Sequence, residues 1–304
     1  MPFTAAAVAA ALASFVLETC PVCAPERPCD THAALERRVI DETREGLASK
    51  DEKARTEAVM KIGALHDAMA NSPSRAATEA LAASLGDPSA DVRLAAAMAF
   101  ARAPQAPALA ELLRALDRER PKIVDPEYDA IDTAQGLARV LDPKAPKPSE
   151  AERRKHKEVA MSRLICSTLV DALGGIPDDR ATAAVIRHLL FSQDKTIDTS
   201  FGPTRCVEAL FRLGSRSGVD AAVAALEREE RVTKASAASR KNLRRSLAAA
   251  LARGAAARGF EDTPPPATGT GAEWRSWFGK HRGEFPAKLG TLAPPPRDTP
   301  AAPK

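Results

Sequence analysis

The sequence predicts an all-α protein whose helices stack in pairs as a repeat array. Alanine dominates the apolar residues, and aromatic residues make up only 4% of the chain. Alanine is the best helix former and lets helices approach closely. Period-two runs of β-branched residues, the pattern of strands, are absent. Matching turns recur: Ala54-Arg55 and Val92-Arg93 lie 38 residues apart, and Leu173-Gly174 and Leu213-Gly214 lie 40 apart. Such a period is typical of helical repeats.

Capping and turn residues predict the order of the helices. Thr31 or Asp30 caps the first helix, and Ser149 caps a long helix later in the chain. Gly174 and Gly214 suit the left-handed residue that ends a helix. We expect helices over residues 30–48, 52–66, 74–85, 90–102, 108–118, 128–141, 149–173, 178–190, 203–213, 218–229 and 236–253. They pair as 52–66 with 74–85, 90–102 with 108–118, 149–173 with 178–190, and 203–213 with 218–229, and the last helix closes the array.

The chain divides into three parts. Residues 1–32 form an Ala-rich N-terminal segment followed by a Cys-rich stretch. Residues 33–258 form the array, with a Pro-rich interruption near 142–148 because each proline disfavours helix in the residue before it. Residues 259–304 comprise a Pro-rich linker, a helix near 270–285 and a tail whose composition predicts disorder.

The C-terminal helix holds both tryptophans of the chain. Thr270 and Glu273 have the spacing of a capping box, and three aromatic residues then fall on one helical side: Trp274, Trp277 and Phe278. A repeat array needs its apolar end covered, so we expect this helix to cap the array over residues 247–251. The alternative is a short motif that docks elsewhere.

The stretch Val92 to Phe100 (VRLAAAMAF), after the turn Gly86-Asp87-Pro88, resembles the first helix of the HEAT-like repeats once associated with phycobilisome lyases. The turn from Leu173-Gly174 to Arg180-Ala181 is similar to the turn into the second helix of such repeats. The resemblance, which covers about residues 33–258, implies a right-handed α-solenoid with a C-terminal capping helix and a bacterial origin. It also implies a structural pair between repeats, formed here by Arg93 with Asp87 or Asp91.

HEAT-like repeats usually present a binding surface, so the resemblance implies a non-catalytic scaffold or adaptor that binds protein or peptide on the concave face made by the second helices. The chain has no His-Glu dipeptide, Walker loop or G-x-S-x-G motif, so we expect no enzyme and no cofactor. Candidate surface residues are Arg187, His188, Glu227 and Glu229. The alternative is binding of nucleic acid, which we expect less because the array lacks aromatic residues for stacking. It would use two basic runs: Arg153, Arg154, Lys155 and Lys157, and Arg240, Lys241, Arg244 and Arg245.

A cysteine-rich segment leaves a second alternative open. Cys20, Cys23, Cys29 and His32 are four ligand types that suit tetrahedral zinc. The same cysteines also suit a disulfide, which we favour over zinc, or plain thiols. With metal, the chain would be a metal-binding envelope protein organised by this segment. Cys166 and Cys206 lie on apolar helix faces, so we expect them in the core.

Compartment and partners follow only in outline. Residues 4–17 are uncharged and Ala-rich and end near a signal-peptidase-like pattern, but the first basic residue is Arg27, so export and cytoplasm stay equally open. The stretch is too short to span a bilayer as a helix, so we expect no transmembrane segment. We expect a monomer that binds an unidentified protein or peptide.

Overall fold

In the computed structural model, the described residues are 30–70, 74–123, 149–194, 202–231, 237–260 and 268–290, and within them the fold is all-helical, without a strand. The α-helices are α2 (Asp30–Ala48), α3 (Glu52–Ala68), α4 (Arg75–Ser84), α5 (Ala90–Arg102), α6 (Leu109–Glu119), α8 (Glu150–Leu173), α9 (Asp179–Asp194), α10 (Pro203–Leu213), α11 (Arg216–Arg231), α12 (Ala237–Ala256) and α13 (Gly271–His281). Short 3-10 helices are η1 (Ala106–Ala108), η2 (Arg120–Ile123) and η3 (Arg282–Glu284). The all-α prediction is confirmed, and the expected helix over 128–141 lies outside the described residues.

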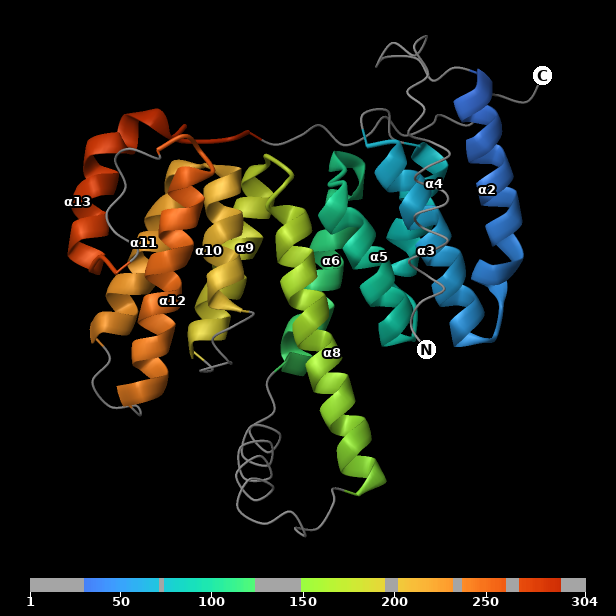
Figure 1. Ribbon diagram of the computed structural model, residues 1–304, viewed down its shortest axis with the longest axis horizontal. Coiled ribbons are helices and arrows are strands. Elements are labelled where there is room, and N and C mark those ends of the chain that lie inside the picture. Colours follow the sequence, from blue (N-terminus) through green and yellow to red (C-terminus); the bar gives the residue numbers. More distant parts are fainter. Residues whose placement is uncertain are drawn as a thin grey trace.

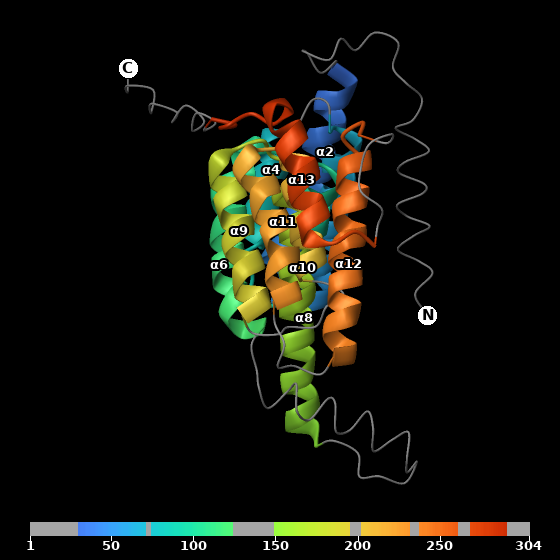
Figure 2. The same cartoon turned by 90° about the vertical axis from the view of Figure 1, so that its left-hand side faces the viewer.

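The helices follow one another along the long axis of the molecule and form two layers (Figures 1 and 2). In the first layer, α3, α5, α8, α10 and α12 pack in that order, and in the second α4, α6, α9, α11 and α13 do the same. Helix α2 packs beside α3 at one end. First-layer helices begin at the end drawn lowest in Figure 1, and second-layer helices from α4 to α11 finish there. We call this the lower end.

Capping explains where several helices begin. The Ser74 and Ser89 hydroxyls accept hydrogen bonds from Ala77 N and Val92 N, and these bonds begin α4 and α5. Ser149 and Thr270 each form a complete capping box, with Glu152 and Glu273 as the partners. Gly214 ends α10 with φ +67°, the left-handed conformation expected from the sequence. For Gly174 the same expectation was wrong, because it ends α8 with φ −61° in the right-handed region.

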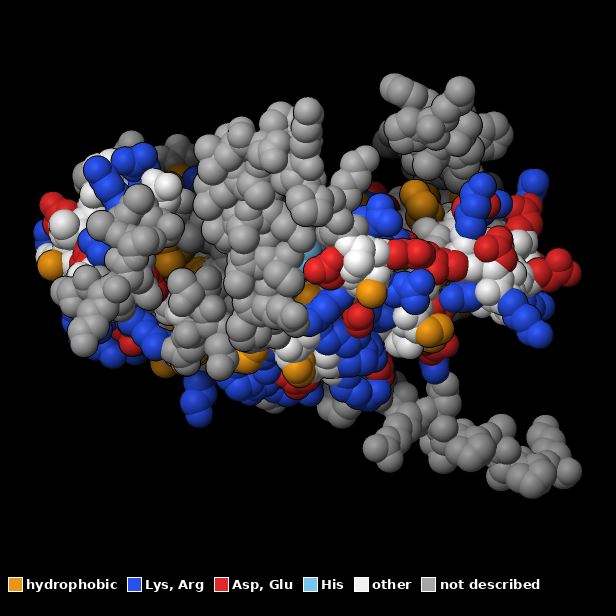
Figure 3. Space-filling view, turned by 90° about the horizontal axis from the view of Figure 1, so that it is seen from below, with side chains coloured by type: hydrophobic (Ala, Val, Ile, Leu, Met, Phe, Trp, Pro, Cys, Tyr) orange, Lys and Arg blue, Asp and Glu red, His pale blue; other side chains and the backbone are white. Residues whose placement is uncertain are grey.

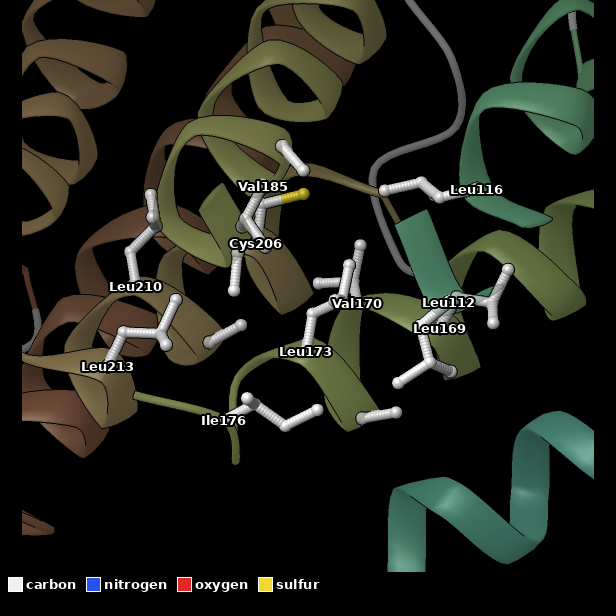
Figure 4. Close-up of a cluster of buried hydrophobic side chains, with 14 of the residues drawn as sticks. Leu112, Leu116, Leu169, Val170, Leu173, Ile176, Val185, Cys206, Leu210 and Leu213 are labelled. Atoms are coloured by element: carbon white, nitrogen blue, oxygen red, sulfur yellow. The ribbon is translucent and has the colours of Figure 1, made fainter. Parts of the chain in front are cut away.

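The core continues from α6 into α8, across the segment between them in the sequence. Figure 4 shows one apolar cluster with side chains from α6, α8, α9 and α10. Each of these side chains has less than 4% of its surface exposed, and the labelled members are Leu112, Leu116, Leu169, Val170, Leu173, Ile176, Val185, Cys206, Leu210 and Leu213. Helix α8 therefore packs beside α5 and α6 as the next helix of the first layer.

Arginines in the first turns of α3 and α5 make the same set of contacts. Arg55 donates to the carbonyls of Ser49 and Lys50 before its helix and forms a fork with Asp87 (Nε–Oδ2 2.9 Å, Nη2–Oδ1 3.1 Å). Arg93 donates to the carbonyls of Asp87 and Pro88, both at 2.9 Å. Arg55 and Arg93, which lie 38 residues apart, therefore bind the turns before α3 and α5 in the same way.

The acidic partner of Arg93 differs from our prediction. We expected Asp87 or Asp91, but Arg93 pairs with Glu119 at the end of α6 (Nε–Oε1 2.9 Å). Asp87 is taken by Arg55, and Asp91 lies 3.4 Å from Lys157 Nζ of α8. The expected kind of pair does occur, because Arg55 with Asp87 joins α3 to the turn before α5. Closeness in the sequence therefore does not tell which acid pairs with which arginine.

Glu119 is the most buried charge of this network, with no exposed surface. Ser162 of α8 donates to Glu119 Oε2 at 2.9 Å, and Lys122 Nζ of η2 lies 3.3 Å from Oε1. Burial alone would raise the pKa of Glu119, but Arg93, Ser162 and Lys122 outweigh it and hold that pKa below its usual value. One carboxylate therefore joins α5, α6, η2 and α8.

Helix α13 is the second-layer neighbour of α11. Arg275 forms a fork with Glu227 (2.9 and 2.8 Å) and also pairs with Asp220. Trp274 and Trp277 are 0% and 5% exposed, and Phe278 is buried as well. The Trp277 ring lies 5.3 Å from that of Phe260 and 6.5 Å from that of Phe211. We expected α13 to cover residues 247–251 of α12, whereas it packs chiefly against α11.

The segment after α13 runs back over the upper end of the stack (Figure 1). Phe285 is fully buried, and Arg258 lies over its ring. The Pro286 carbonyl accepts a hydrogen bond from Arg216 N, the first residue of α11, at 2.9 Å. The Gly290 carbonyl accepts one from Asp179 N, the first residue of α9, at 3.0 Å. These carbonyls satisfy amide groups that a helix start leaves unpaired.

We predict that removing the carboxylate of Glu119 destabilises the protein strongly. In Glu119→Ala the Arg93 guanidinium stays buried without its counter-ion, and breaking a buried pair in this way typically costs about 3–5 kcal/mol. The measurement is the free energy of unfolding in urea. Glu111→Ala, in a partly exposed pair with Arg114 on the same helix, is the matched control and should change stability by less than about 1 kcal/mol. Equal effects of the two substitutions would contradict the prediction.

We predict that Trp277→Ala lowers the melting temperature, because truncation of a buried aromatic side chain typically costs about 3–5 kcal/mol. Truncation before Thr268 should act at least as strongly, since it also removes Arg275, Phe285 and the two carbonyls at the starts of α9 and α11. Truncation after Leu292 leaves all these contacts in place and should melt like the full chain. If truncation before Thr268 also melts like the full chain, α13 is a detachable motif.

Candidate interaction surface

The two basic runs of the sequence lie at the same end of the molecule. Each occupies the start of a first-layer helix, one on α8 and the other on α12, and first-layer helices begin at the lower end (Figure 1). Four side chains of the first run are exposed: Arg153, Arg154, Lys155 and Lys157. In the second run Lys241 and Arg245 are exposed and Arg244 is half-buried, whereas the side chain of Arg240 lies outside the described residues.

Second-layer helices bring further basic residues to this end. Arg118 and Lys122, where α6 passes into η2, have 41% and 34% of their side chains exposed. Arg187 is exposed on the last two turns of α9. Seen from below, Lys and Arg side chains gather in the middle of the lower half of the view (Figure 3). We use the name basic end surface for the exposed members of this set together with the half-buried Lys122. These residues are Arg118, Lys122, Arg153, Arg154, Lys155, Lys157, Arg187, Lys241 and Arg245.

An exposed aliphatic side chain lies among these charges. Leu190 of α9 is 46% exposed and follows Arg187 by three residues, so the two side chains lie on the same side of the helix. The other large apolar side chains described as exposed are Met60, Met98 and Leu164, on first-layer helices. All four are aliphatic or methionine, and none is aromatic. The lower end of α9 therefore combines a cation with an apolar contact.

Two of the four predicted surface residues are buried. His188 and Glu229 are each 2% exposed. Glu229 of α11 lies against α9, whereas His188 of α9 lies close enough to Arg120 of η2 to be affected by its charge. Gln193 of α9 donates to Glu229 Oε1 at 3.2 Å and to the Ala225 carbonyl at 3.0 Å, which joins these helices. Of the remaining two, Arg187 is exposed, and Glu227 is the partner of Arg275. For His188 and Glu229 the surface prediction was therefore wrong.

A layer of buried polar groups lies beneath the basic end surface. Arg120 of η2 pairs with Asp117 through Nη1 (2.9 Å), whereas its Nε and Nη2 have no hydrogen-bond partner within the described part of the chain. The same holds for His188 Nδ1 and Ser192 Oγ on α9. Burial, aided by the nearby charge of Arg120, lowers the pKa of His188 to about 4. His188 is therefore neutral at pH 7 and adds no charge to this end.

The cysteines divide between described and undescribed parts of the chain. Cys20, Cys23 and Cys29 lie outside the described residues, as does the side chain of His32, so zinc and disulfide both stay hypotheses. Cys166 and Cys206 are free and buried, as predicted, and burial raises the pKa of both thiols. Within the described ranges, no group of three or more His, Cys, Asp or Glu side chains is placed to hold a metal ion.

Comparison with known proteins does not assign the chain to a family. No model of a protein family matches the chain, and no curated protein matches it either. The resemblance to HEAT-like repeats therefore remains a prediction from the sequence.

Among the helices that the structure describes, none has the length and apolar character needed to cross a membrane.

We predict that burial of His66 makes the protein sensitive to mild acid. Its ring is 0% exposed and lies edge-on to Phe100 at 5.3 Å. Burial lowers the pKa of His66 from 6.5 to about 4. The unfolded chain therefore takes up this proton first as the pH falls. The resulting stability is complete above about pH 6.5 and is lost between about pH 6.5 and 4, by up to about 3 kcal/mol.

The measurement is the free energy of unfolding at pH 7 and pH 5 for the natural chain and for His66→Leu. The difference between the two pH values should shrink in His66→Leu. His156→Gln, on the projecting start of α8, is the control and should keep the natural difference. An unchanged difference in His66→Leu would contradict the prediction.

Proposed function

We propose that this chain is a non-catalytic scaffold built as a right-handed α-solenoid of HEAT-type helix pairs, with α13 as its closing helix. Its function is to bind a protein or peptide segment on the face made by the second helices. The observation that supports this proposal is the layering: α4, α6, α9, α11 and α13 lie side by side, so their outer sides form one continuous face (Figure 2). Stacked helix pairs of this kind create extended binding surfaces.

The side chains of this face fit a bound chain. Small exposed residues lie on successive helices, among them Ala76 and Ala83 of α4, Ala110 of α6 and Ala183 of α9. Alanine methyl groups let a partner approach the helix backbones closely, whereas Arg114 and Arg187 offer hydrogen bonds beside them. α13 completes the same layer, which supports its role as a cap.

The experiment selects peptides from a random display library on the immobilised full chain. We expect a set of related sequences that bind with affinities near the micromolar range. Ala183→Trp fills the second-layer face and should weaken their binding by about tenfold or more, equivalent to about 1.4 kcal/mol. Ala160→Trp, at an exposed alanine of α8 in the first layer, is the matched control.

Two results would contradict the proposed function. One is that no related sequences are enriched. The other is that Ala160→Trp blocks the selected peptides and Ala183→Trp does not. Melting curves of both variants show whether the tryptophan has disturbed the fold instead of the surface.

Nucleic acid binding is the second candidate, and one observation favours it. The two basic runs, far apart in sequence, begin helices at the same end of the molecule (Figure 1). A row of cations of this kind can neutralise phosphates. Binding to a DNA duplex that weakens steeply with salt would support this candidate.

A further inference from the structure

Three buried polar side chains near the ends of α6 and α9 have hydrogen-bonding atoms without a partner. Within the described part of the chain, none is found for Arg120 Nε and Nη2, His188 Nδ1 or Ser192 Oγ. His188 and Ser192 are 2% and 1% exposed. Burying a polar group without a partner costs free energy, and burying a charge costs more, so such groups are rare in folded proteins. Three of them in one region indicate a site for a ligand that accepts hydrogen bonds.

The unpaired side of Arg120 has the geometry that binds two oxygens at once. Its Nη1 lies 2.9 Å from Asp117 Oδ1, which leaves Nε and Nη2 as the unpaired atoms. Arg55 uses the same two atoms to bind both carboxylate oxygens of Asp87, at 2.9 and 3.1 Å. The N–H groups of this fork are parallel and match carboxylate and phosphate oxygens. Arg120 therefore offers a buried fork to an oxyanion.

The three side chains lie where the end of α9 meets the start of α10. A Cβ on Gly202, the N-cap of α10, would lie 3.4 Å from Ser192 Oγ. His188 precedes Ser192 by four residues, so the two share one side of α9. Burial lowers the pKa of His188, and the charge of Arg120 adds to this shift. Burial raises the pKa of Cys206 in the first turn of α10, and the same charge opposes that shift. Arg120 is therefore close to both helices.

The start of α10 favours a negative charge at this place. A helix start carries a partial positive charge and backbone amides that lack partners within the helix, which together bind anions. Gly202 supplies no side-chain cap to these amides. The end of α9 carries the opposite partial charge, but the full charge of Arg120 exceeds it. The nearest acids of η2 and α6 are already bound, Asp117 by Arg120 and Glu119 by Arg93.

We propose that Arg120, Ser192 and the start of α10 bind a small tetrahedral oxyanion such as phosphate. The Arg120 fork donates to two of its oxygens and the Ser192 hydroxyl to a third, while His188 can donate from Nδ1. A carboxylate has only two oxygens, which the fork alone would occupy. The ligand is a free ion, because the donor atoms are buried, and the Arg120 side chain, 16% exposed, leaves it a route from solvent. This site is separate from the peptide-binding face of the proposed function.

The test is calorimetric titration of the full chain at pH 7 with sodium phosphate and with sodium acetate at equal ionic strength. We expect phosphate to bind at least about tenfold more tightly than acetate, a difference of about 1.4 kcal/mol. A peptide with one phosphoserine should bind at least about tenfold more weakly than free phosphate, because its backbone cannot follow the phosphate inside. Phosphate should also raise the melting temperature, because it binds the folded chain.

Variants place the binding at this site. Arg120→Met should weaken phosphate binding by about tenfold or more, and Ser192→Ala by a smaller factor. In phosphate-free buffer Arg120→Met should melt no lower than the natural chain, because it removes a buried charge with unpaired N–H groups. Arg114→Met is the matched control. Arg114 pairs with Glu111 three residues earlier, as Arg120 does with Asp117, so its loss makes the same charge change on the same helix end and should not alter phosphate binding.

Three results would overturn the inference: equal affinity for phosphate and acetate, equal effects of Arg120→Met and Arg114→Met on phosphate binding, or tighter binding of the phosphoserine peptide than of free phosphate. If Arg120→Met does not fold, Ser192→Ala decides. Full phosphate affinity in Ser192→Ala then overturns the inference, and a weakened affinity supports it. Peptide binding by the second-layer face is judged separately, with Ala183→Trp.

Discussion

The buried carboxylate of Glu119 is the interaction on which the continuity of the structure depends. It ends α6 and contacts Arg93 of α5, Lys122 of η2 and Ser162 of α8. These contacts join helices on both sides of the interruption in the sequence, at the point where apolar residues of α6 and α8 share one cluster. A buried ion pair adds little net stability compared with apolar packing. Its geometry, however, defines one position of α8 against α5 and α6.

The same arginine position organises two successive turns. Arg55 and Arg93 each bind the carbonyls before their own helix and an acid near the end of the following second-layer helix. Asp87 lies just after α4, and Glu119 is the last residue of α6. Arg55 pairs with Asp87 and Arg93 pairs with Glu119, so the two arginines keep similar contacts with different acids. A chain of this kind can tolerate irregular spacing, because each unit is positioned by its neighbour.

The direction of the helices concentrates positive charge at one end. Arg118 in the last turn of α6 is favoured there by the helix dipole, whereas Arg187 lies about two turns before the end of α9, beyond the reach of that effect. The basic residues at the starts of α8 and α12 are not favoured by it, yet the alternation of the two layers brings them to the same end. The basic end surface therefore arises from topology as well as composition, and the overall net charge of +4 does not reveal it.

The sequence by itself determined the helices, because caps, glycine turns and prolines act within one or two helical turns. Ser149 and Thr270 form the predicted capping boxes, and Cys166 and Cys206 are buried as expected. Only the tertiary structure decided the partners. Glu119 instead of Asp87 pairs with Arg93, α13 packs chiefly on α11, and His188 faces inward. Each of these depends on which helices become neighbours, and that choice is made by burial across the whole stack, which no short stretch of sequence contains.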